Sequence, residues 1–247
     1  MNALVRLFAW LFALTVVTLP VVAVLNGWFA SDRWPLGQLR VSAEFQRVSA
    51  EQVQAAVRPH LDRGFFAVDL EGVRASLAAL PWVEQVAVRK LWPDTLEIAL
   101  VEHRALARWG ESRLLSDRGQ LFEVPDLETL QGLPRFEAAD SQIDEVMQMY
   151  ARTQPLLTLV GDAPQHLQLS PRGAWTLLLA SGTELVLGRS QPLPRLERFV
   201  AALPELKRAE ARPLLRADLR YANGFALLWA EPPAVEAGTP AAPRRNT

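Results

Sequence analysis

The chain has 247 residues, of which 50% are hydrophobic and 21% are charged, so it is long enough to bury a core in one or two domains. Its formal net charge of −1 gives no electrostatic basis for binding nucleic acid. Cysteine is absent, which excludes disulfide scaffolds, thiol nucleophiles and thiolate metal sites.

Residues 7–25 carry no charged side chain, and we predict a membrane-spanning helix over residues 7–28. The uncharged run forms a helix of roughly 28 Å, which matches the hydrocarbon thickness of a bilayer. Arg6 and the α-amino group are the only positive charges before it, so the positive-inside rule places residues 1–6 in the cytoplasm as a short tail. The alternative is a cleaved secretory signal with a cleavage site at residues 21–23. Both interpretations place the chain after residue 30 outside the cytoplasm.

Residues 35–104 predict a small α+β domain with the order β-α-α-β-β. A first strand is followed by Ser49 and Gln52, which are spaced as a capping box at the start of a helix. Asp69 can cap a second helix, and a proline ends each of the two. We expect both helices to pack on one face of a three-stranded sheet.

A β-hairpin completes this domain, with its turn at Trp92-Pro93-Asp94. Trp82 and Trp92 each border a proline, and we interpret both as packing residues rather than partner contacts. Four carboxylates surround the hairpin and are interpreted as a charged solvent face rather than as a catalytic acid and base: Glu84, Asp94, Glu97 and Glu102.

Residues 105–231 predict a β-rich domain with flanking helices. The turn at Asp117-Arg118-Gly119, a meander over residues 166–188 and a last hairpin at Asn223-Gly224 define its strands. One helix begins at residue 140 or 141 and is limited by Pro155, and another begins at Pro194. Residues 232–247 lack periodicity and predict a disordered tail.

The sequence contains no motif that indicates an enzyme. The three histidines are far apart in sequence, and none stands in a metal-binding motif. No serine fits a nucleophile motif, and no glycine-rich loop could hold a phosphate. We therefore predict no catalytic residue, no metal, no cofactor and no small-molecule substrate.

The last strand is the best candidate for a recognition surface. One of its faces carries Phe225, Leu227 and Trp229, and the other carries Ala226 and Leu228, so both faces are apolar. If this strand lies at a sheet edge, its free N–H and C=O groups are a template for a partner strand. If it is central or covered, the same residues belong to the core. The sequence leaves these two interpretations open.

Several short motifs resemble one family of bacterial cell-division proteins, FtsQ/DivIB, in which a POTRA domain follows a membrane anchor. The motifs that carry the resemblance are Pro81-Trp82-Val83, Arg89, Trp92-Pro93, Glu102, Ala107-Arg108-Trp109, residues 114–122, residues 218–221, Asn223-Gly224 and Trp229. Two features depart from the family pattern. The tail before the apolar run is short, and Ala105 stands where family members often have proline.

The resemblance implies a single-pass protein of the inner membrane, with a cytoplasmic N-terminus and most of the chain in the periplasm. It implies a non-catalytic scaffold of the divisome that links early cytoplasmic with late periplasmic division proteins. The last strand would bind FtsB, and FtsL through it, by strand addition. The POTRA domain, as a second recognition surface, and the membrane helix would contact other divisome proteins. The residues implied in FtsB binding are Tyr221, Asn223, Gly224, Phe225, Leu227, Trp229 and either Arg195 or Arg198.

Each implied role has a competing one. For Tyr221 the competing role is cross-strand packing, and for the two arginines it is solvation of a helix face. At the level of the whole chain, a POTRA-containing component of protein export or envelope assembly is the first alternative. A membrane-anchored periplasmic enzyme of the cell wall is the second.

Overall fold

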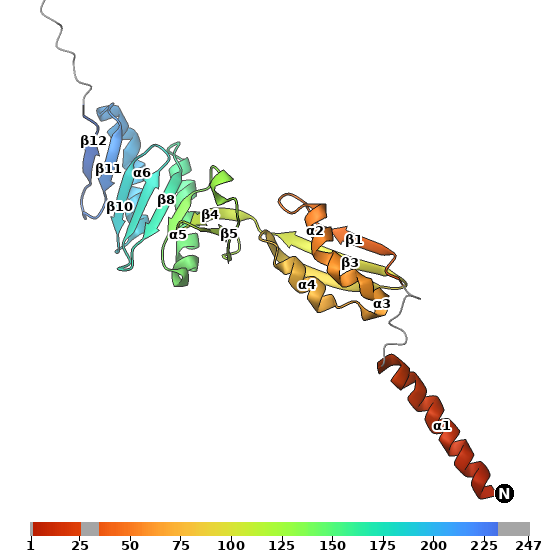
Figure 1. The fold of residues 1–247 in the computed structure, drawn as a ribbon. Helices are drawn as coiled ribbons and strands as arrows, with labels where there is room; N and C mark the ends of the chain where they lie inside the picture. The colour runs from red at the N-terminus through yellow and green to blue at the C-terminus, as the bar shows by residue number, and fades with distance from the viewer. Residues whose placement is uncertain (1, 26–34, 232–247) are drawn as a thin grey trace, which may run out of the picture. The chain divides into compact units, whose positions relative to one another are not determined.

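The computed structural model describes residues 2–25 and 35–231, which form two compact units (Figure 1). Unit 1 comprises residues 1–104 and 122–125, and unit 2 comprises residues 105–121 and 126–247. The predicted disordered tail, residues 232–247, and the end of the predicted membrane span, residues 26–28, lie outside the described residues.

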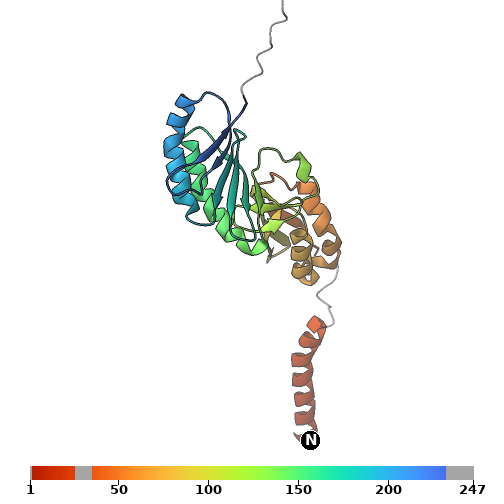
Figure 2. The same ribbon diagram turned by 90° about the vertical axis from the view of Figure 1, so that its left-hand side faces the viewer.

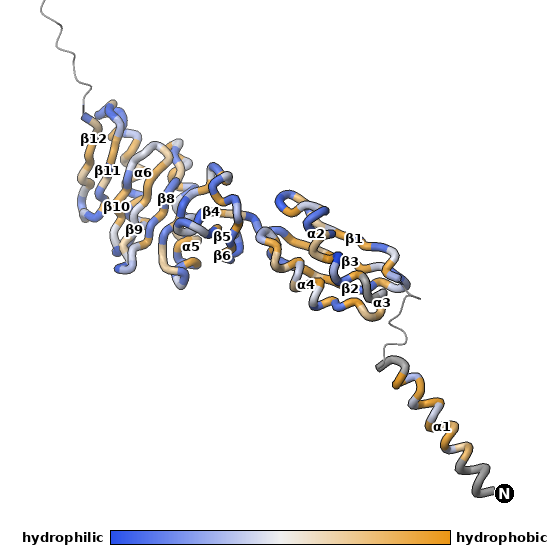
Figure 3. Tube along the Cα trace, in the orientation of Figure 1, coloured by the Kyte–Doolittle hydropathy of each residue, from blue (hydrophilic) through white to orange (hydrophobic). Residues whose placement is uncertain are grey.

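The chain begins with helix α1 (Asn2–Leu25). Its described side chains, residues 8–22, are all exposed, and Figure 3 shows that hydrophobic residues predominate among them. Among the residues that the structure describes, we find no helix that is both long enough and apolar enough to cross a membrane. The predicted membrane span therefore stays a prediction.

The rest of unit 1 has the predicted β-α-α-β-β order. Its sheet has the strand order β1-β3-β2, in which β3 pairs with β1 in parallel and with β2 antiparallel. The bounds are β1 (Gln38–Ser42), α2 (Ala50–Val57), a 3-10 helix η1 (Arg58–Arg63), α3 (Gly64–Ala67), α4 (Leu70–Ala78), β2 (Val83–Leu91) and β3 (Thr95–Glu102). One hydrophobic core joins the apolar faces of α2 and α4 to the sheet.

Local sequence signals explain where these helices begin. The Ser49 side chain accepts a hydrogen bond from the Gln52 N–H, and the Gln52 side chain accepts one from the Ser49 N–H, which confirms the capping box. The Asp69 carboxylate accepts hydrogen bonds from two backbone N–H groups at the start of α4, as predicted. Helix α2 ends at Val57 and η1 begins at Arg58, directly before Pro59, as predicted.

Two expectations for the hairpin were wrong. Trp92 does not pack, because 75% of its surface is exposed at the β2–β3 turn, whereas Trp82 is half-buried against the ring of Phe122. Glu102 is not a simple solvent-facing charge. Its carboxylate accepts hydrogen bonds from the backbone N–H groups of residues 46–48 at 2.8–3.3 Å and so ties the β1–α2 loop to the end of β3.

Unit 2 is a nine-stranded sheet with the order β12-β11-β10-β9-β8-β7-β4-β5-β6. Figure 2 shows its two long helices along one face of the sheet, where one hydrophobic core buries their inner sides. The bounds are β4 (Ala105–Trp109), β5 (Arg113–Ser116), β6 (Leu121–Phe122), β7 (Arg135–Glu137), α5 (Ile143–Thr158), β8 (Pro164–Leu169), β9 (Trp175–Leu179), β10 (Glu184–Gly188), α6 (Pro192–Ala209), β11 (Leu214–Asp218) and β12 (Ala226–Trp229). The 3-10 helices are η2 (Leu127–Thr129) and η3 (Asp140–Gln142).

The structure confirms the meander and corrects two helix boundaries. Helix α5 continues through Pro155, which was predicted to limit it, because the fully buried Leu157 lies on the same inner face as Val146. Burial of that side chain outweighs the single backbone hydrogen bond that the proline removes. Helix α6 begins at Pro192 rather than Pro194, and a proline at either position fits the first turn.

Candidate functional site

Strand β12 forms one edge of the nine-stranded sheet. It pairs antiparallel with β11 on one side, and no strand among the described residues pairs with its other side. The interpretation of the last strand as a sheet edge is therefore confirmed, and its interpretation as a central strand was wrong. The sequence left this choice open because strand order depends on which distant strands pair, and periodicity does not report that.

The two faces of β12 differ in burial. The side chains of Leu227 and Trp229 are half-buried and pack against the core, as does Phe225, whose ring meets that of Phe199 edge-on at 5.5 Å. On the opposite face Leu228 is 56% exposed. Three of the residues implied in partner binding, Phe225, Leu227 and Trp229, thus hold the strand onto its own domain.

The backbone of β12 offers its free hydrogen-bonding groups along the open edge. The Ala230 N–H donates to the Pro213 carbonyl at 2.9 Å, on the β11 side. Because backbone groups of an antiparallel strand alternate in direction, those of Leu227 and Trp229 point away from β11. This edge contains no charged residue and no proline, the two devices that commonly protect an exposed edge.

The connection into β12 is longer than predicted. Asp218 pairs with Ala226, so residues 219–225 form a loop rather than a two-residue turn at Asn223-Gly224. Neither of those two residues has the positive φ that such a turn requires. The loop is extended because the Leu219 N–H still donates to the Val186 carbonyl at 2.9 Å, which continues the pairing with β10.

Arg198 of α6 fixes this loop from the helix side. Its guanidinium donates hydrogen bonds to the backbone carbonyl oxygens of Tyr221, at 3.2 Å, and of Ala222. It also lies over the Phe225 ring, with its Cζ atom 5.8 Å from the ring centroid. The side chain of Tyr221 itself is 57% exposed, so the competing role in cross-strand packing was wrong for this residue.

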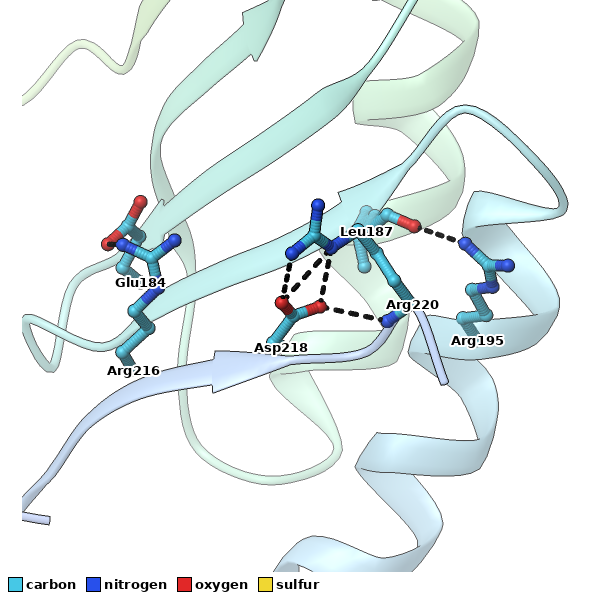
Figure 4. Close-up of polar contacts among 6 residues, drawn as sticks. All are labelled: Glu184, Leu187, Arg195, Arg216, Asp218 and Arg220. Carbon is cyan, nitrogen blue, oxygen red and sulfur yellow. Dashed lines mark hydrogen bonds and ion pairs between the residues drawn. The ribbon is translucent and has the colours of Figure 1, made fainter. Parts of the chain in front are cut away.

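The charged side chains near the edge are largely paired within unit 2 (Figure 4). Arg195 donates a hydrogen bond of 2.7 Å to the Leu187 carbonyl, and Arg216 bonds Glu184 at 3.0 Å. Hydrogen bonds from Arg220 hold the pKa of the Asp218 carboxyl below its ordinary value, and the same pairing raises the pKa of Arg220. Neither a free charged contact nor simple solvation therefore describes Arg195 or Arg198.

A further ion pair lies at the other end of β12. Arg212 donates to the Glu210 carboxylate at 2.7 Å and to the Ala230 carbonyl at 3.3 Å. These bonds from Arg212 lower the pKa of Glu210 to about 2. Sequence reasoning missed this pair and the Asp218–Arg220 pair, although the same spacing of an acid and an arginine two residues later flanks β11 on both sides.

A cavity of about 300 Å³ lies beside Trp229, between β12 and the end of α6. Its lining includes the apolar side chains of Phe199, Leu203 and Leu214, together with Lys207 and the Glu210–Arg212 pair. Across the described ranges, no group of three acidic or histidine side chains could hold a metal ion. The geometry suits protein recognition along a strand edge.

The histidines have structural surroundings. His60 forms a hydrogen bond of 2.9 Å with the Ser76 hydroxyl, and the His103 ring stacks on Phe122 with centroids 4.2 Å apart. His166 lies 3.4 Å from the Glu137 carboxylate, and its pKa is lowered mainly by burial.

Comparison with known proteins identifies both units. The family model described as POTRA domain, FtsQ-type, matches residues 34–103, and that described as Cell division protein FtsQ/DivIB, C-terminal, matches residues 107–220. The chain is 47% identical to the cell division protein FtsQ of Xanthomonas campestris over 91% of this chain and 81% of the relative. It is 36% identical to FtsQ of Allochromatium vinosum over 85% of this chain and 84% of the relative, and 34% identical to FtsQ of Burkholderia pseudomallei over 87% and 88%.

Proposed function

This chain belongs to the FtsQ/DivIB family of bacterial cell-division proteins, and we propose that it is a non-catalytic scaffold of the division machinery. In this role it binds division proteins and connects those that assemble early in the cytoplasm with those that act later in the periplasm. Family membership supports the role in cell division, and the absence of catalytic motifs from the sequence supports a function in binding.

We propose that the partner at unit 2 is the periplasmic segment of FtsB, with FtsL held through it. One observation carries this proposal: β12 is an uncharged edge strand whose outward backbone groups have no strand partner among the described residues. A partner strand would pair with the backbone of Leu227 and Trp229 and cover the exposed Leu228. Tyr221, which is exposed in the loop that leads into β12, is the aromatic contact of the type expected at a binding hot spot.

We also propose that α1 anchors the chain in the inner membrane, with the N-terminus in the cytoplasm and both units in the periplasm. The uncharged run of residues 7–25 supports this, as do the exposed apolar side chains of residues 8–22. A helix whose apolar residues lie on all sides buries them in lipid or in another protein.

Hydrogen exchange on the full chain tests strand addition directly. Binding of the FtsB periplasmic segment is expected to slow exchange of the backbone N–H groups of Leu227 and Trp229, because these point to the open edge. The N–H of Ala230, already bonded to Pro213, serves as the internal reference. Protection elsewhere, with these two amides unchanged, would place the partner on another surface.

A matched pair of substitutions separates binding from stability. Leu228→Lys places a charge beside the pairing groups and is expected to weaken FtsB binding, because charges on an edge oppose strand addition. Leu215→Lys places the same charge on an exposed apolar position of the neighbouring strand β11 and is the control. Equal loss of binding in both variants would contradict docking at the β12 edge.

A further inference from the structure

One end of unit 1 presents aromatic side chains to solvent. Trp92, at the β2–β3 turn, is 75% exposed, and Phe66, in α3, is 49% exposed. Elsewhere in residues 35–104, the large apolar side chains that are exposed are Phe45, at 39%, and Val101, at 42%. Two large aromatic residues exposed at one end of a small domain indicate a surface that contacts something else.

One hydrogen bond places α3, which carries Phe66, beside the end of β2, next to the turn that carries Trp92. The ammonium group of Lys90, two residues before Trp92, donates a hydrogen bond of 2.9 Å to the Phe66 carbonyl oxygen. Helix α3 therefore lies beside the end of β2. The Phe66 ring meets the buried Phe65 edge-on, with centroids 5.2 Å apart. We call Trp92 and Phe66 the aromatic tip of unit 1.

The chain that leads back to α1 starts at this tip. The N–H groups of Gly37 and Gln38 donate to the Asp94 carbonyl at 3.0 and 3.3 Å, so β1 begins next to the turn that carries Trp92. Figure 1 shows α3 and the start of β1 at the same end of the unit. Helix α1 ends at Leu25, and the described chain resumes at residue 35. Even when fully extended, a connection of that length reaches at most about 35 Å.

We infer that the aromatic tip lies on the membrane surface and that Trp92 and Phe66 contact the interfacial region of the lipid bilayer. The inference rests on the proposed anchoring by α1, because the short connection keeps the tip close to the face from which the anchor emerges. Tryptophan favours this region because its ring is apolar while its N–H can stay hydrated. The tip thus gives unit 1 a second attachment and restricts its tilt on the membrane.

The charges named here near the tip are of both signs, three positive and two negative. Arg40 and Arg89 both pair with Glu97, and the Lys90 ammonium is held by the Phe66 carbonyl. Asp94 adds a negative charge at the turn itself. Contact through aromatic rings does not depend on charge pairing, so it is expected to persist at high salt.

Single labels on the full chain test this inference, since the protein has no native cysteine. A polarity-sensitive fluorophore is attached to the chain at Trp92→Cys or at Phe66→Cys, and the labelled chain is reconstituted in phosphatidylcholine vesicles. Lipids that carry a nitroxide near the headgroup act as the quencher. Val101→Cys is the matched control, because it is also exposed, at 42%, but lies near the far end of β3, about 20 Å along the strand from the turn. Quenching at positions 92 and 66 is expected to exceed that at position 101 by about twofold or more.

Equal quenching at positions 92 and 101 would overturn the inference. A fourth label, at Leu11→Cys in α1, separates the two proposals: quenching there with none at the tip contradicts only the tip contact, whereas none at position 11 contradicts the anchor itself. Quenching of native tryptophan fluorescence by brominated lipids, compared between the wild-type chain and Trp92→Phe, repeats the test without a cysteine. The Trp92→Phe chain is expected to lose part of the quenching, and an unchanged value would again overturn the contact.

Discussion

Arg198 of α6 donates a hydrogen bond of 3.2 Å to the backbone carbonyl oxygen of Tyr221, in the loop that leads into β12. A second bond from the same guanidinium reaches the Ala222 carbonyl. Helix α6 therefore determines the position of the exposed Tyr221 side chain and the point at which β12 begins. A residue that the sequence suggested as a partner contact is a brace for the loop that presents the proposed contact.

Replacing Arg198 is expected to increase the mobility of the loop formed by residues 219–225. In Arg198→Gln the two carbonyl bonds are lost, and backbone hydrogen exchange over residues 219–225 is expected to accelerate in the unbound chain. Arg198→Lys is expected to behave similarly, because an ammonium lacks the planar fork that reaches two carbonyls at once. The cost in folding free energy is about 1 kcal/mol. Arg208→Gln, an exposed change in the last turn of the same helix, is the control. Unchanged exchange in both Arg198 variants would remove its role as a brace.

Tyr221→Ala is expected to weaken FtsB binding by about 2 kcal/mol, in the range of a hot-spot tyrosine, and to leave the folded state intact. Its side chain is mostly exposed, so truncation should change the free energy of unfolding by about 0.5 kcal/mol or less. Isothermal titration and thermal melting measure the two quantities. A large loss of stability with unaltered binding would indicate packing instead.

Glu102→Ala is expected to destabilise unit 1 by about 2 kcal/mol, since three backbone N–H groups lose a charged acceptor. The loop that they belong to follows Phe45, whose φ of 49° lies in the left-handed region and needs such support. Chemical denaturation of the full chain, followed by a probe in unit 1, measures the effect. Glu44→Ala removes a carboxylate that pairs at 3.5 Å with the exposed Arg104, and should change stability little. Equal effects of the two changes would contradict the role of Glu102.

The Glu210–Arg212 pair predicts a pH dependence of stability. The folded-state pKa of Glu210 is about 2, below its ordinary value, so ionisation of this group favours the folded state. This contribution to stability is complete above the pKa of Glu210 in the unfolded chain, about 4.3, and it is lost as the pH falls toward 2. Wild type is expected to be more stable than Glu210→Gln at neutral pH, with the difference disappearing in acid. Thermal melts of both chains between neutral and acidic pH check this, and a difference that does not vary with pH would contradict it.

Short-range signals predicted much of the fold. Ser49, Gln52 and Asp69 begin their helices as expected, because a cap is decided by side-chain and backbone groups three residues apart. The same local reasoning was wrong for Pro155, where burial of Leu157 keeps the helix intact, and for Asn223-Gly224, where pairing with β10 and bonds from Arg198 open the turn into a loop. In each wrong case the deciding contact came from a residue distant in sequence or from the core.

The sequence by itself determined the apolar pattern of β12, the order of elements in unit 1 and the resemblance to one family, since all three depend on residue types at short spacing. Only the tertiary structure decided that β12 is an edge, that its apolar side chains Leu227 and Trp229 face inward, and that Trp92 is exposed while Trp82 packs. The physical reason is that the edge position of a strand and the exposure of a side chain depend on which elements pack against each other. Hydrogen bonds and buried surface between distant segments determine that, and no local pattern contains it.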